Sequence, residues 1–453
     1  MPDEVVNGIE ESENNLPPHV VSRAVRLSYA QAMLGSIYAA STGGMFLIGY
    51  ALKLGANNVQ IGLMSTVPML CVIVQLISST LIERGASRRR MTIFAAVLNV
   101  SGWGLIIALP HATAKASPDF RIGALIAVIA VVTMFAYVSG NARASWVGDL
   151  VPPKRRGMFF GRMMMFAGFV GAVFAIFEGL FLDRINLMGL TAFNWLFTFG
   201  MFFGLLNAMF FIPQADIPVV RSENGIAFRR LVRDTFSNKA LLVVMAYTLI
   251  WSFQGIAGPF YATYMLRDLK IPFLGLGILT SISTVTMLAS SPFWGRIVDR
   301  YGCRPVLIAC TSVLIPMPLA WIWMDSARAV YFISPTLNLF GGFVIAGISV
   351  ALSTLIYKVT PSAGRSMQFA VYSVTILLLV APMPTIGGHL PGWLRALGIH
   401  ADLRSTFYTS VLFIGGAAWM AKYIREPGSH HTMDLVSRLT GHLFNPSTLK
   451  QSE

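Results

Sequence analysis

The chain has 453 residues, of which 55% are hydrophobic and only 12% are charged, and its mean hydropathy is +0.65. Soluble globular proteins carry about 25% charged residues, and this sequence repeatedly shows apolar runs of about 20 residues, long enough to cross a bilayer. These features exclude an ordinary soluble protein, and the net charge of +14 is better explained by basic inner loops of a membrane protein than by nucleic-acid binding.

Residues 1–27 are polar and begin with the acidic stretch MPDEVVNGIEESENN. This stretch lacks the basic start and short apolar core of a cleavable signal peptide, so we expect a disordered cytoplasmic tail. The three cysteines form neither a CxxC motif nor a Cys/His pattern suited to zinc. We therefore expect no metal and no cofactor.

Twelve apolar spans follow in chain order. They are predicted at 28–52, 59–82, 91–110, 122–146, 159–181, 190–212, 240–265, 272–295, 305–325, 330–357, 367–386 and 405–424. Backbone polar groups in lipid must be satisfied within the segment, so the prediction is an all-α polytopic membrane protein with twelve transmembrane helices. Glycine-rich stretches such as STGG (41–44) and FGGFVIAG (340–347) are expected to let neighbouring helices approach closely.

The basic residues set the expected orientation. Lys and Arg concentrate in the loops on one side, and the positive-inside rule places both termini, including the tail 425–453, in the cytoplasm of an inner (plasma) membrane protein. The central loop, 213–239, contains an amphipathic pattern over 227–236, and the tail has a similar one over 433–444. We interpret the loop pattern as a surface tether between two halves, with lipid sensing as the alternative.

Two kinds of charged stretch each occur once in the first half of the chain and once in the second half. ERGASRRR (83–90) follows the second span and GRIVDRYGCRP (295–305) follows the eighth. The matched pairs are Glu83 with Asp299, Arg84 with Arg300, and Arg88 with Arg304. DLVPPKRRGMFFG (149–161) and KVTPSAGRSMQFA (358–370) precede the fifth and eleventh spans, with Arg156 matching Arg365 at nearly the same spacing. Two such matches predict two pseudo-symmetric six-helix bundles, 28–212 and 240–424.

The stretch GRIVDRYGCR resembles the G-x-x-x-D-R-x-G-x-[RK] loop motif of the major facilitator superfamily. The matching residues are Gly295, Asp299, Arg300, Gly302 and Arg304. The twelve spans, the repeat and the long central loop extend the resemblance over nearly the whole chain. The first copy departs from the motif, with Ser79, Glu83 and Ala86 at the positions of the leading Gly, the Asp and the loop Gly. The stretch that contains Trp146 and Asp149 is similar to a version found in bacterial members of unassigned substrate.

The charged stretches predict a cytoplasmic latch. The resemblance implies that the second span meets the eleventh and the eighth meets the fifth, which brings Glu83 and Asp299 to helix N-termini that favour carboxylates. Arg156 and Arg365, just before those helices, add charge partners. The other predicted members are Arg84, Arg88, Asp149, Gly295, Arg300, Gly302 and Arg304. The alternative is that these charges only fix topology and loop shape.

The resemblance also implies a central cavity lined by spans 1, 4, 7 and 10. Polar and aromatic residues inside these spans are candidate substrate contacts, with hydrogen bonding between helices as the alternative. The candidates are Gln31, Tyr38, Trp251, Gln254, Tyr261 and Asn338.

Arg143 is the most distinctive candidate, because a charge near the bilayer centre costs about 2.5–3.5 kcal/mol. It is interpreted as an anchor for an anionic substrate group. Alternatively, its long side chain reaches the interface or pairs with Asp149. Asn141, two residues away, is expected on roughly the opposite face of the helix.

These features favour a secondary or facilitative transporter of a small organic solute, with an anion as one option, that works by alternating access as a monomer in the lipid bilayer. Glu178, an acid inside the fifth span, is a candidate for proton coupling, although an exposed interfacial carboxylate is the alternative. The alternatives for function are a multidrug/proton antiporter and a non-transporting sensor or assembly factor. Enzyme motifs such as HExxH, G-x-S-x-G and the Walker motif are missing from the sequence, so we predict no enzyme and no nucleic-acid partner.

Overall fold

The structure is a computed structural model in which helices form nearly all of the described chain. It describes residues 18–150, 156–185, 189–214, 216, 233, 235–360 and 365–426. No strand occurs in these residues. The pattern predicted over 433–444 and most of the stretch 227–236 lie outside them. The predicted all-α class is confirmed.

The chain divides into two compact units. Within the described residues, unit 1 combines the chain up to Ala56 with the stretch from Leu70 to Asp216, and unit 2 combines Asn57–Met69 with the chain from Arg233 to Glu426. The units thus differ from the predicted bundles in one respect, because residues 57–69 pack with the later part of the chain.

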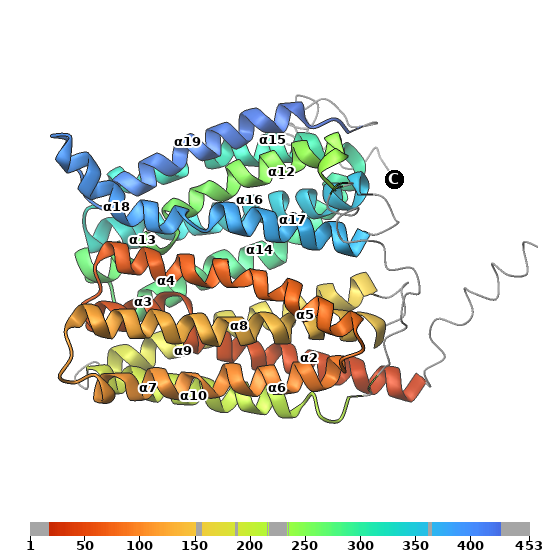
Figure 1. The fold of residues 1–453 in the computed structure, drawn as a ribbon. Helices are drawn as coiled ribbons and strands as arrows, with labels where there is room; N and C mark the ends of the chain where they lie inside the picture. The colour runs from red at the N-terminus through yellow and green to blue at the C-terminus, as the bar shows by residue number, and fades with distance from the viewer. Residues whose placement is uncertain are drawn as a thin grey trace, which may run out of the picture. The chain divides into compact units, whose positions relative to one another are not determined.

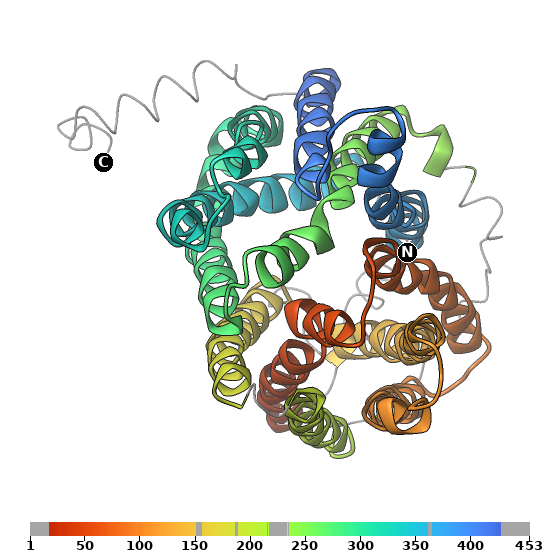
Figure 2. The ribbon, with the colours of Figure 1, turned by 90° about the vertical axis from the view of Figure 1, so that its left-hand side faces the viewer.

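Unit 1 is built from helices that run side by side (Figures 1 and 2). They are α2 (Pro18–Thr42), α3 (Gly44–Lys53), the 3₁₀ turn η1 (Cys71–Ile73), α5 (Val74–Glu83), α6 (Arg88–Ser101), α7 (Trp103–Ala112), α8 (Pro118–Leu150), α9 (Arg156–Arg184) and α10 (Leu190–Met209). Helix α2 packs against α9 and α10, and α6 packs against α8 and α10. This packing buries aromatic side chains such as Tyr50, Trp146 and Phe197.

The first predicted span is interrupted at the STGG stretch. Gly43 is extended and Gly44 has φ +52°, a conformation that favours glycine, so the chain ends α2 and restarts as α3. The close approach expected of these glycines is made instead by Gly200 of α10. A Cβ added there would lie 2.7 Å from the Cβ of Ser41.

Unit 2 contains the remaining helices. They are α4 (Asn58–Leu70), α12 (Lys239–Ser252), η4 (Phe253–Ile256), α13 (Gly258–Thr263), η5 (Tyr264–Asp268), α14 (Phe273–Tyr301), α15 (Cys303–Leu314), η6 (Met317–Ile322), α16 (Ala327–Val359), α17 (Arg365–Val380), α18 (Met383–Ala396), α19 (Ser405–Met420) and η7 (Ala421–Tyr423). Helix α16 packs closely on α14 and α15. As expected for the FGGFVIAG stretch, a Cβ added at Gly342 would lie 2.3 Å from the carbonyl oxygen of Ser283.

Helix α4 is held tightly against α18, and we call this pairing the α4–α18 contact. A Cβ added at Gly62 would lie 2.4 Å from the carbonyl oxygen of Pro384, and one added at Gly388 would lie 2.6 Å from that of Asn58. The Thr66 hydroxyl donates to the carbonyl of Ala381 at 2.7 Å. The two helix backbones therefore touch, and small residues on both sides make this possible.

The second predicted span is divided between the two units, and its helix changes form close to the division. Pro68 lies within α4, lacks a backbone N–H and crowds the preceding turn, and the helix continues after Leu70 as the 3₁₀ turn η1 before α5 begins. Regular α-helix is thus lost at the residues where the units divide.

Eleven helical segments of the described chain are long and apolar enough to cross a membrane, and they correspond to the first eleven predicted spans. The twelfth predicted span is α19, whose 16 residues rise about 24 Å and are continued by η7. The protein is therefore a multi-pass membrane protein, and the predicted twelve helices are close to this count.

Candidate functional site

The GRIVDRYGCRP stretch forms a helix end, a one-residue turn and a helix start. Helix α14 ends at Tyr301, Gly302 adopts φ +93° and ψ 168°, and α15 begins at Cys303. Side chains larger than that of glycine rarely adopt this conformation, which explains the loop glycine of the motif. Asp299 and Arg300 are both exposed.

A carboxylate from a distant part of the sequence caps the start of α15. Glu426 Oε2 accepts hydrogen bonds from the backbone N–H groups of Cys303 at 2.7 Å and Arg304 at 2.9 Å, and Lys358 Nζ lies 2.8 Å from Oε1. Burial opposes ionisation, but the bonds from Lys358 and the Arg304 backbone outweigh it and lower the pKa of Glu426 below its ordinary value. The Arg304 side chain donates to the Lys422 carbonyl at 3.0 Å. Together these bonds tie the segment that follows α19 to the start of α15.

Unit 1 repeats this arrangement with different residues. Gly85 takes the positive φ of +98°, one residue before Ala86, which settles how the first copy turns without the motif glycine. Ser87 caps α6 and donates from Oγ to Asp216 Oδ2 at 3.2 Å. The Arg89 side chain donates to the carbonyl of Ile212, just beyond α10. In each unit the segment after the last helix is thus bound to the start of the third span of its own half, α6 in unit 1 and α15 in unit 2.

Asp216 and Glu426 are the residues that sequence reasoning missed. Each is an acid placed a few residues beyond the sixth span of its half and close to a proline. This shared placement is a detectable signal, because a lone acid that recurs after both halves is unexpected in a chain with so few charges.

The predicted latch stays a prediction. The side chains of Glu83, Asp149, Arg156 and Arg365 lie outside the described part of the structure. Arg84 is exposed, whereas Arg88 is buried and donates to the Ser145 carbonyl at 3.2 Å. Gly295 lies in α14, where an added Cβ would meet no atom within 4 Å.

Arg143 lies in α8 and points toward α9 and the end of α10. Its guanidinium donates to the sulfur of Met163 at 3.8 Å and lies 5.8 Å from the centre of the Phe211 ring. No carboxylate pairs with Arg143 among the described residues. Asn141 lies on another face, where its amide donates to the Ser78 hydroxyl of α5 at 2.6 Å. The arginine is thus surrounded by weak partners that leave its charge available.

The two candidates on α2 are engaged within unit 1. Gln31 is fully buried and donates to the carbonyl of Phe210 at 2.8 Å, while its Oε1 has no hydrogen-bond partner in the described chain. Tyr38 donates to Asn99 Oδ1 at 2.9 Å, and Asn99 in turn donates to the Val132 carbonyl. Both side chains hold α2 against its neighbours.

The seventh predicted span is not one continuous helix, so its candidates do not share a simple helical face. The 3₁₀ turn η4 separates Trp251, which packs against the core, from Tyr261, whose ring stacks on Phe407 at 4.3 Å between ring centres. Gln254 lies in η4, where its backbone carbonyl accepts from the Ala257 N–H at 3.0 Å, and its side chain makes no hydrogen bond with a described residue. A Cβ added at Gly258 would meet nothing within 4 Å. Such a break offers polar groups of the kind that line transporter sites.

The two remaining candidates form hydrogen bonds within their own units. Asn338 donates to the carbonyl of Ser334, one turn earlier in α16, at 2.9 Å. Glu178 in α9 is 3% exposed, and its Oε1 lies 2.5 Å from the Ser41 hydroxyl of α2. The other carboxyl oxygen, Oε2, has no hydrogen-bond partner in the described chain. Glu178 is therefore a buried acid inside unit 1 and not an exposed interfacial one.

Comparison with known families decides the classification. Residues 30–257 and 243–438 match the family model described as Major Facilitator Superfamily. The chain belongs to the major facilitator superfamily. Membership in this superfamily accounts for both the helical repeat and the GRIVDRYGCRP loop motif.

Two curated relatives within the superfamily are named for drug resistance. The chain is 27% identical over 244 residues to "Multidrug resistance protein MdtG" of Proteus mirabilis (strain HI4320), a match that covers 51% of this chain and 56% of the relative. It is 22% identical over 227 residues to "Multi-drug resistance efflux pump PmrA homolog" of Lactococcus lactis subsp. lactis (strain IL1403), covering 49% and 54%. The chain spans about half the length of these curated relatives.

Solved structures of superfamily members show the same fold. A mutant of the nucleoside transporter NupG superposes with a TM-score of 0.68 at 13% identity, covering 89% of this chain and 100% of that chain. The inward-open xylose transporter XylE from E. coli superposes with a TM-score of 0.66 at 15% identity, covering 92% and 99%. At these identities the likeness shows the fold alone.

Proposed function

We propose that this superfamily member moves a small organic solute across the membrane by alternating access, and that the solute carries an anionic group. The observation that supports the solute class is Arg143. It is a cation within a membrane-spanning helix, with a thioether and an aromatic ring as its neighbours. A charge in this setting is costly unless a partner arrives, and a carboxylate or phosphate on the solute is such a partner.

The arginine suits an anion better than a lysine would. Its planar guanidinium offers paired N–H groups that match the two oxygens of a carboxylate. Weak contacts to Met163 and Phe211 hold its position without neutralising it. The proposed role is therefore to attract and orient the anionic end of the solute.

Transport into proteoliposomes tests both parts of the proposal. Succinate, glycerol 3-phosphate and uncharged glycerol serve as probes, and thermal stabilisation of the purified protein by each is measured alongside flux. Arg143→Gln is expected to abolish anion stabilisation and flux, while Arg162→Gln, which removes an exposed arginine of α9, leaves both intact. Equal stabilisation of wild type and Arg143→Gln by the anions would refute the anchor. Absence of flux with every solute would favour a non-transporting sensor or assembly factor.

Multidrug/proton antiport is the second candidate function. It is favoured by the names of the two curated relatives and by the buried carboxyl group of Glu178, since a membrane-embedded acid is a natural carrier for a coupling proton. The Ser41 hydroxyl at 2.5 Å supplies a hydrogen bond to that group from a second helix. In this scheme, gain and loss of a proton at Glu178 changes how α9 and α2 hold together.

The orientation and the latch belong to the same proposal. Both termini are proposed to lie in the cytoplasm of an inner (plasma) membrane, because the basic connectors of the repeat follow the positive-inside rule. The chain is proposed to act as a monomer. Opening and closing of the cytoplasmic side is proposed to use the charged latch of residues 83–90 and 295–305.

A further inference from the structure

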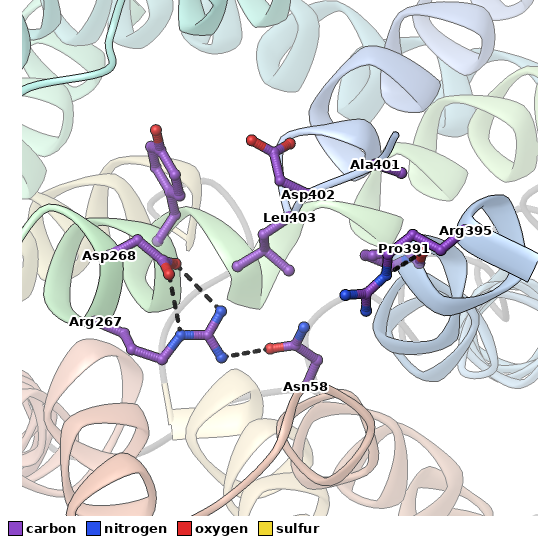
Figure 3. A pocket seen from close by; sticks show the side chains of 9 residues that line it. Asn58, Arg267, Asp268, Pro391, Arg395, Ala401, Asp402 and Leu403 are labelled. Atoms are coloured by element: carbon purple, nitrogen blue, oxygen red, sulfur yellow. Dashed lines mark hydrogen bonds and ion pairs between the residues drawn. The ribbon is translucent and has the colours of Figure 1, made fainter. Parts of the chain in front are cut away.

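A pocket of about 310 Å³ lies within unit 2 (Figure 3). Its walls come from three places in the chain: the end of η5, the start of α4, and the segment from α18 to α19. Buried Tyr264, Pro391 and Leu403 give it an apolar floor. The Tyr264 hydroxyl is already used, since it donates to the carbonyl of Met324 at 3.2 Å.

Polar groups enter the pocket from opposite sides. Arg267 is neutralised by Asp268, 3.2 Å away, and donates to Asn58 Oδ1 at 2.7 Å. Because Oδ1 of Asn58 accepts this bond, its Nδ2 group remains a donor. The second carboxylate at the rim, Asp402, is paired with Arg404 at 2.7 Å.

Among the described residues, no carboxylate pairs with Arg395, the remaining charge in this pocket. Its Nε donates to the carbonyl of Pro391 at 3.1 Å, one turn back in α18, which fixes the orientation of the guanidinium. The two terminal nitrogens point toward the middle of the pocket (Figure 3) and bond to no described residue. A planar pair of N–H groups with this freedom matches the two oxygens of a carboxylate.

We propose that this pocket binds a small organic carboxylate, with Arg395 holding its two oxygens, Asn58 donating from Nδ2, and the short apolar part lying on Leu403 and Pro391. The charge balance favours an anion, because Asp268 and Asp402 each have an arginine partner while Arg395 has no acidic partner among the described residues. The volume is at the lower end of the roughly 300–1,000 Å³ usual for ligand pockets, which limits the ligand to a small molecule. The site is separate from Arg143 and stands whether or not the chain transports.

The binding also has a structural consequence for α4. Asn58 is the first residue of α4, and it reaches the pocket through its bond with Arg267. A carboxylate held by both Asn58 and Arg395 joins α4 to α18 at their shared end. Occupancy of the pocket thus strengthens the α4–α18 contact.

Calorimetric titration of the full-length protein in phosphatidylcholine nanodiscs tests the site with three matched probes: propionate, its uncharged isostere propionamide, and the cation propylamine. Propionate is expected to bind, and the other two are not. Arg395→Gln is expected to weaken propionate at least tenfold, about 1.4 kcal/mol. Asn58→Asp, which keeps an acceptor for Arg267 but loses the donor, is expected to weaken it as well. The control Arg328→Gln, an exposed arginine at the start of α16, is expected to bind as wild type does.

Each alternative has its own result. Unchanged propionate binding by Arg395→Gln, or equal binding of propionamide, would overturn the proposal in favour of a solvated arginine. Loss of propionate binding when phosphatidylglycerol replaces phosphatidylcholine would assign the pocket to a lipid headgroup and would also overturn it. Arg143→Gln with intact propionate binding separates this site from the proposed transport site.

Discussion

Replacing Gly62 by alanine should weaken the α4–α18 contact, because the added Cβ would lie 2.4 Å from the carbonyl oxygen of Pro384 and 2.8 Å from the Cα of Thr385. Both are backbone atoms of α18, so relief requires a helix to move. Overpacking of this kind costs about 1–3 kcal/mol. If only the conformation that contains the α4–α18 contact bears this cost, its population falls by about 5- to 150-fold relative to conformations without the contact.

Cross-linking reports this population directly. The hydroxyl oxygens of Thr66 and Thr385 lie 2.8 Å apart, so Thr66→Cys with Thr385→Cys places two thiols within reach of disulfide formation. The three native cysteines are buried and free, and do not compete readily. A protease site engineered into the central loop, 213–239, makes the readout simple, because only cross-linked chains stay whole after cleavage.

The control comes from α18, the helix that Gly62 contacts. A Cβ added at Gly392 of α18 would meet nothing within 4 Å, so Gly392→Ala should cross-link as the parent does, while Gly62→Ala falls several-fold. Melting temperatures of both variants show whether either has simply lost its fold. Equal cross-linking yields for Gly62→Ala and Gly392→Ala would refute the reasoning from backbone contact.

Three further predictions follow from the site. Glu426→Gln should destabilise the protein at pH 7 by about 1–3 kcal/mol, measured as a lowered melting temperature. Because the pKa of Glu426 is lowered on folding, its stabilisation is complete above the ordinary value of 4.5 and is lost as pH falls through the folded value, so the variant should also lose this acid dependence. Glu178→Gln should abolish solute uptake driven by a pH gradient yet keep exchange at equal pH, whereas retention of both would dismiss Glu178 as the proton carrier. Gly302→Ala should cost about 1–3 kcal/mol because of φ +93°, whereas Gly295→Ala should be neutral, and equal melting temperatures would contradict this.

Much of the fold can be predicted from hydropathy. A membrane span must form all the hydrogen bonds of its backbone N–H and C=O groups within itself, so it appears in the sequence as a long apolar helix. The breaks within spans do not follow from it. Gly43 and Gly44 are equally compatible with helix packing, and the Gln254 and Gly255 of η4 are residues that a regular membrane helix can also contain. Whether a glycine bends a helix or receives a neighbour depends on the packing of other segments, which hydropathy does not encode.

The candidate site could be predicted less fully, for a physical reason. A polar side chain in a membrane helix can face a solute or a neighbouring helix, and composition is the same in both cases. Tyr38 and Asn338 have partners inside their own units, whereas Arg143 has only weak ones. Glu426 was assigned to a tail because it follows the last span, and only the folded chain shows that it caps α15.

The placement of α4 bears on how this chain can be divided. By sequence α4 belongs to the first repeat, yet it packs among the helices of unit 2 against α18. Dividing the gene within the central loop would therefore yield a second fragment that lacks one helix of its own unit, α4. The second would leave uncovered the surface at Gly388 that receives the start of α4, a helix it does not encode, and the first would carry that helix. The two fragments should consequently recover a folded protein only when made together, with α4 acting as the donated element that joins them.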